Sequence, residues 1–259
     1  MPDRGVGTAA DSGPLRFARY AYPPNALGYC GPDAAPLLLE HTARGADDAD
    51  LRRLLRGFEG AWPYLELIAT ANGLRDPLDA RVVEAYWVGN VLLDRVGPRL
   101  MGDSVESRFR GRTSLRSWSR LAEVLPTGAV PHHSFHVLAV YPWVGLLRGG
   151  HAGDEPLRVM DRCRVRWGQV LTIAGPVAVV RSRPLAWDGR RLTLAAPVDE
   201  PAVLRVGDRG LAGALRPGDW CSLHWDWVCE RLDGWQVATL RRRTLDQLAA
   251  VNGTADCPV

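Results

Sequence analysis

The spacing of the hydrophobic residues changes once along this chain of 259 residues, and that change sets the fold class. Up to about residue 150 they recur at helical spacing, as in Leu51, Leu54 and Phe58. After about Asp154 the spacing falls to two residues, which is typical of half-buried strands. The sequence therefore predicts an α+β protein: an N-terminal all-helical domain followed by a small OB-like β-barrel with a C-terminal helix.

Turn and capping signals place the expected elements within this frame. Asp76-Pro77 predicts the start of a long helix, and residues 132–147 are expected to form one buried helix. Asp188-Gly189 predicts a tight hairpin, and residues 239–251 predict a closing amphipathic helix. The expected segments are a disordered N-terminus over 1–13, a helical domain over 14–153, a β-barrel domain over 154–252 and a tail over 253–259.

Charge and composition argue against several classes of function. The net charge is only +3, and the 32 basic residues are all arginines, scattered apart from Arg241–Arg243. We expect no nucleic-acid partner, because nucleic acid requires basic residues gathered on one face. No run of apolar residues is long enough to span a membrane, so we expect no membrane partner. The first residues lack the apolar core of a secretory signal.

The five cysteines are scattered, and none of them forms a CxxC pair. This spacing argues against a structural zinc knuckle, and the missing export signal argues against a disulfide framework. We therefore expect a cytoplasmic protein with free thiols. Cys221 and Cys229 are expected to pack inside the barrel, where a free cysteine behaves as a small hydrophobic residue.

Two fragments of the C-terminal region combine a cysteine with a histidine. The first runs from Cys163 through Gly168 to Val170, and the second is a Pro-Gly-Asp turn leading into a strand that carries His224. A thiolate and an imidazole on neighbouring strands of a small barrel would form a soft, open metal site. The alternative is a metal-free barrel in which Cys163 and His224 are ordinary buried residues.

These fragments, in this order, resemble the hydrogenase maturation chaperones of the HypC/HupF type. The resemblance covers about residues 160–250. It includes Cys163 and Gly168, the Pro-Gly-Asp turn, His224, and the acidic Asp233 before a terminal helix. It implies that residues 154–252 form a HypC/HupF-like domain. Such chaperones carry an iron centre with cyanide and carbon monoxide ligands toward the large subunit of a nickel–iron hydrogenase.

The resemblance also implies roles for individual residues and partners. Cys163 would be the main iron ligand and His224 the second. The expected cofactor is iron, with or without cyanide and carbon monoxide ligands, and the expected partners are the hydrogenase large subunit and other maturation proteins. Because a carrier does not turn over a small substrate, we expect an accessory protein and not an enzyme.

Two features depart from the chaperones. Their cysteine lies at or next to the processed N-terminus, whereas Cys163 is internal. Arg162, Arg164 and Arg166 also surround the cysteine at positions where the chaperones are mostly apolar. These arginines either lower the pKa of the Cys163 thiol and favour the thiolate, or lie on the solvated faces of a strand.

The helical region offers secondary candidates. Cys30 lies just before Pro32-Asp33, an expected helix start whose dipole would lower the pKa of the thiol. It is a candidate reactive thiol or metal ligand, and the alternative is a packed cysteine in a tight turn. His132 and His136 would share one face of a helix, a spacing that can hold a metal. Helix capping after Pro131 is the alternative.

Two other functions remain open at this point. One is an enzyme whose site is made by Cys30 with His132, His133 and His136. The other is a metal-free interaction module built on an OB-like barrel. The helical region is similar to uncharacterised domains of actinobacterial proteins, and this similarity implies no mechanism.

Overall fold

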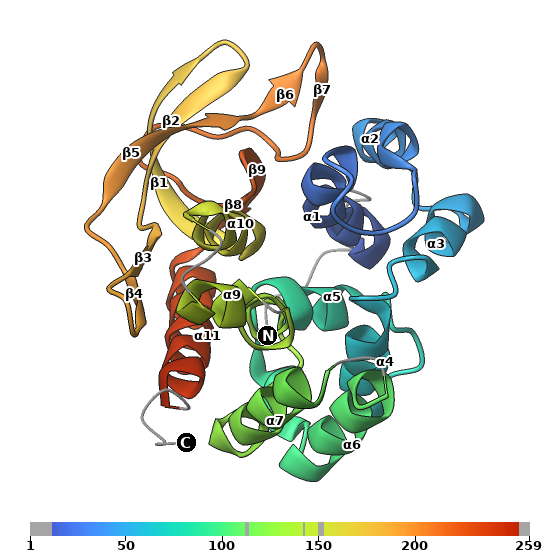
Figure 1. Ribbon diagram of the computed structural model, residues 1–259. Helices are drawn as coiled ribbons and strands as arrows, with labels where there is room; N and C mark the ends of the chain where they lie inside the picture. The colour runs from blue at the N-terminus through green and yellow to red at the C-terminus, as the bar shows by residue number, and fades with distance from the viewer. Residues whose placement is uncertain (1–11, 112–113, 142, 150–152, 254–259) are drawn as a thin grey trace.

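The computed structural model describes residues 12–111, 114–141, 143–149 and 153–253, and it shows an α+β protein (Figure 1). A helical region is followed by a mixed five-stranded sheet and a C-terminal helix, which confirms the α+β part of the prediction. Most of the expected N-terminal segment 1–13 and of the tail 253–259 lies outside the described residues. Gly13 already belongs to the first helix and Gly253 to the last, so the predicted boundaries are wrong at these two residues.

Short helices joined by tight turns build the helical region. In chain order they are α1 (Gly13–Ala26), α2 (Ala35–Arg44), α3 (Ala49–Arg56), α4 (Trp62–Ala71), α5 (Ala80–Trp87), α6 (Pro98–Phe109), α7 (Leu115–Val124), α8 (His133–Phe135), α9 (Trp143–Gly149) and α10 (Glu155–Cys163). The 3-10 turns η2 (Val91–Arg95) and η3 (Leu125–Thr127) follow α5 and α7. The π-helix η4 (His136–Val140) continues α8.

Aspartates that accept hydrogen bonds from backbone N–H groups determine where two of these helices begin. The carboxylate of Asp48 accepts from two backbone N–H groups and caps α3. The predicted helix start at Asp76-Pro77 is wrong. Asp76 instead closes a turn by accepting from the backbone of Leu78, and Asp79 caps α5.

The segment predicted as one buried helix over 132–147 is divided. α8 and η4 end at Tyr141, whose backbone is extended, and α9 follows as a separate helix. Tyr141 precedes Pro142, and a residue before proline avoids helical backbone. His133 and His136 therefore lie on a short α-to-π helical segment, a type of irregularity that frequently occurs at functional sites.

The sheet follows the helical region in the chain, and it is made of short strands. They are β1 (Arg166–Ala174), β2 (Val177–Ser182), β5 (Val198–Val203), β8 (Trp220–His224) and β9 (Trp227–Leu232), with the small pairs β3 (Leu185–Trp187) with β4 (Leu192–Leu194) and β6 (Arg205–Val206) with β7 (Arg209–Gly210). β1 pairs with β2 and β8, β2 with β5, and β8 with β9, all antiparallel. One parallel pair, Val203 with Trp227, joins β5 to β9 and closes the ring of pairings. The hairpin predicted at Asp188-Gly189 is confirmed by β3 and β4.

The start of the strand region differs from the prediction. Residues 155–163 form α10, and the strands begin only at Arg166. The buried residues of α10 include Pro156, Val159, Met160 and Cys163, which recur at helical spacing. Cys163 is therefore the last residue of a helix, not part of a strand.

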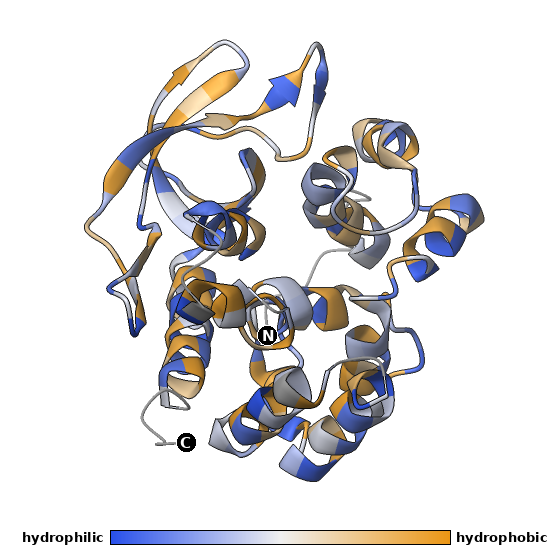
Figure 2. Cartoon of the chain, in the orientation of Figure 1, coloured by the Kyte–Doolittle hydropathy of each residue, from blue (hydrophilic) through white to orange (hydrophobic). Residues whose placement is uncertain are grey.

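The hydrophobic core runs across the predicted domain boundary. One cluster of buried residues joins Phe17 and Tyr20 of α1 to Trp167 of β1 and Cys229 of β9, and it also includes Leu240 of α11 (Gly234–Gly253). In Figure 2 hydrophobic and hydrophilic residues both occur along the long strands and along α11, as expected for elements with one face in a core. The helical region and the sheet therefore stabilise one another.

A buried ionic network attaches α1 to the sheet. The carboxylate of Glu230 in β9 accepts hydrogen bonds from Arg16 at 2.9 Å and from the hydroxyl of Tyr20 at 2.7 Å. The Tyr20 hydroxyl also lies 2.8 Å from the Ser222 hydroxyl in β8. Within the described part of the chain, every helix is too short or too polar to cross a lipid bilayer.

Candidate metal centre

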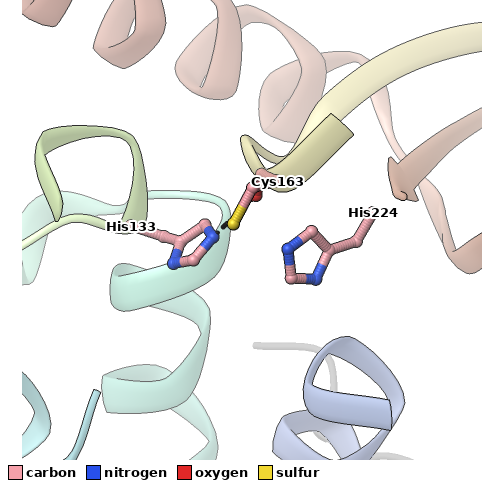
Figure 3. A group of neighbouring side chains, drawn as sticks. All are labelled: His133, Cys163 and His224. Carbon is pink, nitrogen blue, oxygen red and sulfur yellow. Dashed lines mark hydrogen bonds between the residues drawn. The ribbon is translucent and has the colours of Figure 1, made fainter. Parts of the chain in front are cut away.

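His133, Cys163 and His224 lie together where the helical region meets the sheet (Figure 3). One ligand atom from each residue lies within 4.8 Å of the others, and all three residues are buried. His133 comes from α8, Cys163 from the end of α10 and His224 from the end of β8. The structure thus brings the predicted pair Cys163 and His224 together and adds a third residue from the helical region.

His224 is held in the orientation that a metal ligand needs. Its Nδ1 donates a hydrogen bond to the backbone carbonyl of Tyr20 in α1, at 2.6 Å. Because a carbonyl only accepts, the proton is on Nδ1 and Nε2 carries a lone pair. Nε2 is buried and has no hydrogen-bond partner among the described residues. Figure 3 shows the ring with one nitrogen turned toward Cys163 and His133.

Burial keeps His224 neutral, as metal binding requires. Loss of hydration lowers the pKa of this imidazole to about 4, and the nearby carbonyls of Tyr20 and Cys163 only partly oppose that effect. A histidine whose Nδ1 binds a backbone carbonyl while Nε2 stays free is typical of protein metal sites. The orphaned Nε2 is thus an observation that a metal would explain.

His133 makes two hydrogen bonds. Its Nε2 lies 2.8 Å from the backbone carbonyl of Cys163, so Nε2 carries the proton and donates it. Nδ1 then accepts from the hydroxyl of Tyr86, at 3.2 Å. Burial lowers the pKa of His133 well below its usual value, and proximity to His224 adds to that shift. His133 is neutral, and it can bind a metal through Nε2 only by releasing the Cys163 carbonyl.

Cys163 is a protonated thiol in this environment. Burial raises the pKa of the Cys163 thiol well above its usual value, and the neighbouring Cys30 adds to the effect. The hypothesis that the flanking arginines lower this pKa is therefore wrong. A metal would convert the thiol to a thiolate by displacing its proton.

Two of the flanking arginines, Arg162 and Arg166, instead form a clamp around Glu200 of β5. Arg166 forms ion pairs with Glu200 and donates to the backbone carbonyl of Trp225 at 2.6 Å. Arg162 donates to Glu200 at 2.6 Å. Arg164 pairs with Asp161, and both Arg164 and Arg166 are fully buried. Arg164 and Arg166 therefore do not lie on solvated strand faces, so the second interpretation of the arginines is wrong for these two residues.

The clamp fixes the spacing between Cys163 and His224. The residues next to these two side chains, Arg162 and Trp225, are joined by a backbone hydrogen bond of 2.7 Å from the Trp225 N–H to the Arg162 carbonyl. Trp225 has a φ of 54°, which is rare for a bulky residue, and its side chain is buried. This strained turn after β8 is held by the hydrogen bonds from Arg166 and to Arg162, and it positions His224.

The secondary candidates lie outside the three-residue cluster. The Nδ1 of His132 accepts a hydrogen bond from the backbone N–H of Ser134. His132 therefore caps α8, the role named above as the alternative to metal binding. The Nδ1 of His136 lies 3.4 Å from the Tyr64 hydroxyl. Cys30 is not at a helix start, because α2 begins at Ala35, and burial raises the pKa of its thiol to about 12. The prediction of a lowered Cys30 pKa is wrong.

A cavity of about 100 Å³ adjoins the cluster. All three cluster residues line it, and so do the secondary candidates Cys30 and His136. The remaining walls are mostly aromatic and include Tyr86, Trp87, Tyr141, Trp143 and Trp225. The predicted pair Cys163 and His224 therefore shares one space with two of the three secondary candidates, Cys30 and His136.

The donor set indicates which metals would fit. One thiolate and two imidazoles suit borderline and soft transition metals such as iron, zinc and copper. Three protein ligands leave at least one coordination position open, unlike a four-ligand structural site. The arrangement could hold a metal and leave it accessible from the cavity.

Residues 9–257 match the model of one protein family, described as a family of unknown function (DUF6390). No curated protein and no solved structure matches the chain.

Proposed function

We propose that this chain, which belongs to the DUF6390 family, is an iron-binding maturation factor that delivers its metal to a client protein. The observation that carries the proposal is the convergence of Cys163 and His224, with the Nε2 of His224 buried and unpartnered among the described residues. These are the two residues to which the resemblance to HypC/HupF-type chaperones assigns iron binding. The client would be the large subunit of a nickel–iron hydrogenase.

The coordination chemistry supports a carrier over a structural site. Cys163 and His224 are available as resident ligands, whereas His133 is hydrogen-bonded and would join only on release of the Cys163 carbonyl. A thiolate and an imidazole bind iron without enclosing it, so the metal stays transferable. Cyanide and carbon monoxide would occupy positions on the cavity side.

The sheet supports the same proposal. Its five strands form a closed ring of pairings with a terminal helix, as expected for an OB-like, HypC/HupF-like domain. The cysteine of those chaperones lies at the N-terminus, but Cys163 ends α10 and is backed by the helical region. We propose that the helical region shields the metal and contributes to client docking. A cytoplasmic location follows from the proposal, because the carrier thiol must stay reduced.

One observation favours a second candidate, a metal-dependent enzyme. Cys30 and His136 line the same cavity as the metal cluster, so a substrate in that space would meet all of them. This candidate requires turnover of a small molecule, and the carrier does not. The metal-free interaction module is less well supported, because it leaves the buried Nε2 of His224 without a role.

The test is iron analysis and infrared spectroscopy on protein purified without oxygen from cells that also make the hydrogenase maturation machinery. The variants are Cys163→Ala, His224→Ala and Cys30→Ala, and Cys221→Ala is the matched control because it removes another buried thiol of the sheet region. Iron and the cyanide and carbon monoxide bands should disappear in Cys163→Ala and His224→Ala and persist in Cys221→Ala. Loss in Cys30→Ala as well would bring the helical region into the site. The absence of iron from the wild-type protein would overturn the proposal.

A further inference from the structure

We propose that a pocket where α1, α5, β9 and α11 meet binds a small polar ligand through an oxyanion group, either a carboxylate or a phosphate. The pocket has a volume of about 360 Å³. It is distinct from the cavity beside Cys163, because no described residue lines both spaces. The inference goes beyond the proposed function and does not depend on iron binding.

Arginines dominate the walls of this pocket. Four of them line it: Arg16 and Arg19 of α1, Arg81 of α5 and Arg231 of β9. The acidic residues of the described lining are Glu84 and Glu230. A guanidinium group stays charged near neutral pH. Positive charge therefore exceeds negative charge here, even when Asp79, the ion-pair partner of Arg81, is included.

The two glutamates of the pocket are already satisfied by donors from the protein. Arg16 lies between them, with its Nη2 2.9 Å from Glu230 and 3.2 Å from Glu84. The Tyr20 hydroxyl also donates to Glu230, and the side-chain amide of Gln236 donates to Glu84, each at 2.7 Å. A cationic ligand would have to displace these donors, whereas an anion would not.

Arg231 supplies the clearest contact for an anion. Its side chain is exposed and lines the pocket, and its guanidinium has no ion-pair partner within the described part of the chain. Arg19 lines the same pocket, and only 12% of its side chain is exposed, so an anion beside it would be partly shielded from dissolved salt. The planar N–H fork of a guanidinium matches two oxygens of a carboxylate or a phosphate.

The size and the walls of the pocket limit the rest of the ligand. A volume of about 360 Å³ lies near the lower end of the range for small-molecule sites, which is about 300–1,000 Å³. The described lining contains no aromatic side chain on which a nucleobase would stack. Ala80 is its one apolar residue. The ligand is therefore small and polar, such as a short carboxylic acid or a phosphate ester with few carbons.

Isothermal titration calorimetry on the full, metal-free chain at low ionic strength tests the proposal with three probes. Succinate and inorganic phosphate carry the two candidate oxyanions, and succinamide has the shape of succinate without its charge. One succinate or phosphate should bind per chain and weaken as salt is added, and succinamide should bind about tenfold or more weakly. Failure of both anions to bind, or equal binding of succinate and succinamide, would overturn the proposal. Neither result bears on iron binding.

The same titration distinguishes a small ligand from an acidic partner protein. A short polyglutamate peptide presents carboxylates on an extended chain. If the peptide binds while succinate and phosphate do not, the arginines are a contact for a protein and the small-ligand proposal fails. Binding of a small anion with an affinity equal to or above that of the peptide supports the proposal.

Variants locate the bound anion. Arg231→Gln should lower the affinity about tenfold, because it removes a charged hydrogen-bond donor. Arg209→Gln changes an exposed arginine of β7 outside the pocket, so as the matched control it should leave the affinity unchanged. Ala80→Glu places a carboxylate in the pocket at the first residue of α5, where an acidic side chain favours the helix. It should fold and no longer bind the anion. Undiminished binding in both pocket variants would overturn the proposal.

Discussion

The Nε2 of His133 donates a hydrogen bond to the backbone carbonyl of Cys163, at 2.8 Å. A side chain of α8 thus holds the main-chain end of α10 at the residue that supplies the thiol. His133 positions Cys163, and it could serve as a metal ligand only by exchanging this hydrogen bond for the metal.

Replacing His133 should therefore weaken metal binding without abolishing it. His133→Gln retains a donor for the Cys163 carbonyl, and His133→Ala does not. We expect His133→Ala to lower the affinity for ferrous iron about 10- to 100-fold, the usual cost of losing an orienting partner, whereas Cys163→Ala removes binding altogether. Competition with a chelator of known affinity measures both. Near-normal affinity in His133→Gln indicates a positioning role, and equal loss in both His133 variants indicates a direct ligand.

Acid should destabilise the metal-free protein through its buried histidines. Burial lowers the pKa values of His132 and His136 to about 3, whereas histidine in an unfolded chain has a pKa near 6.5. Below about pH 6.5 the unfolded state binds protons that the folded state does not, so stability falls as the pH falls. Each histidine contributes about 1.4 kcal/mol per pH unit between about pH 6.5 and its folded pKa.

Urea unfolding of the metal-free protein between pH 7 and pH 5 measures this dependence. His136→Phe removes one titrating group from the cavity wall, so its free energy of unfolding should depend less steeply on pH. A wild-type free energy of unfolding that does not change over this range would contradict the burial of neutral histidines.

The clamp around Glu200 predicts a large loss of stability from one small change. Glu200→Gln leaves the buried Arg166 without its carboxylate partner, and breaking a buried ion pair costs about 3 kcal/mol or more. Asp199→Asn is the matched control, because the neighbouring Asp199 pairs with Arg181 on the exposed side of the same strands. Exposed pairs contribute little, so Asp199→Asn should leave the unfolding midpoint nearly unchanged.

The affinity for iron should also differ between Glu200→Gln and Asp199→Asn. Because Arg166 also holds the carbonyl of Trp225, Glu200→Gln should loosen the turn that positions His224. We expect weaker iron binding in Glu200→Gln at temperatures where the variant is still folded, and normal binding in Asp199→Asn. Equal affinities would show that the clamp acts on stability alone.

The sheet region should not fold without the helical region. A fragment of residues 154–253 lacks Phe17 and Tyr20, which share a core with Trp167 and Cys229. It also leaves Glu230 without Arg16, its partner in α1. Circular dichroism and amide hydrogen exchange on this fragment should show no cooperative unfolding. A cooperatively folded fragment would instead support an independent domain over 154–252.

Local sequence patterns were sufficient to predict the α+β class, whereas the pairing of Cys163 with His224 was an expectation from the resemblance to HypC/HupF-type chaperones. The change in hydrophobic spacing marks the passage from helices to strands, and turn residues such as Asp188-Gly189 act within a few positions. α10 was missed because it is short and lies between two regions of clearer periodicity. Its buried positions Val159, Met160 and Cys163 carry the helical signal that identifies it.

His133 was missed as a member of the cluster for a different reason. The i, i+4 spacing of His132 and His136 assumes a continuous helix, but His132 is the cap that precedes α8. Which of the three neighbouring histidines faces Cys163 depends on how α8 packs against α10, a long-range contact that no local pattern encodes. The same holds for Cys30, which reaches the cavity through the packing of the turn before α2.

The hydrogen bond from His224 to the Tyr20 carbonyl makes the chemistry of the sheet depend on α1. That carbonyl decides which nitrogen of the ring carries the proton, and so whether a lone pair faces the metal. Any displacement of α1 that breaks this bond frees the imidazole to change tautomer and place its proton on Nε2, where a metal can no longer bind. In the proposed carrier, α1 would therefore control whether His224 can hold the metal, and a partner that displaced α1 would release it.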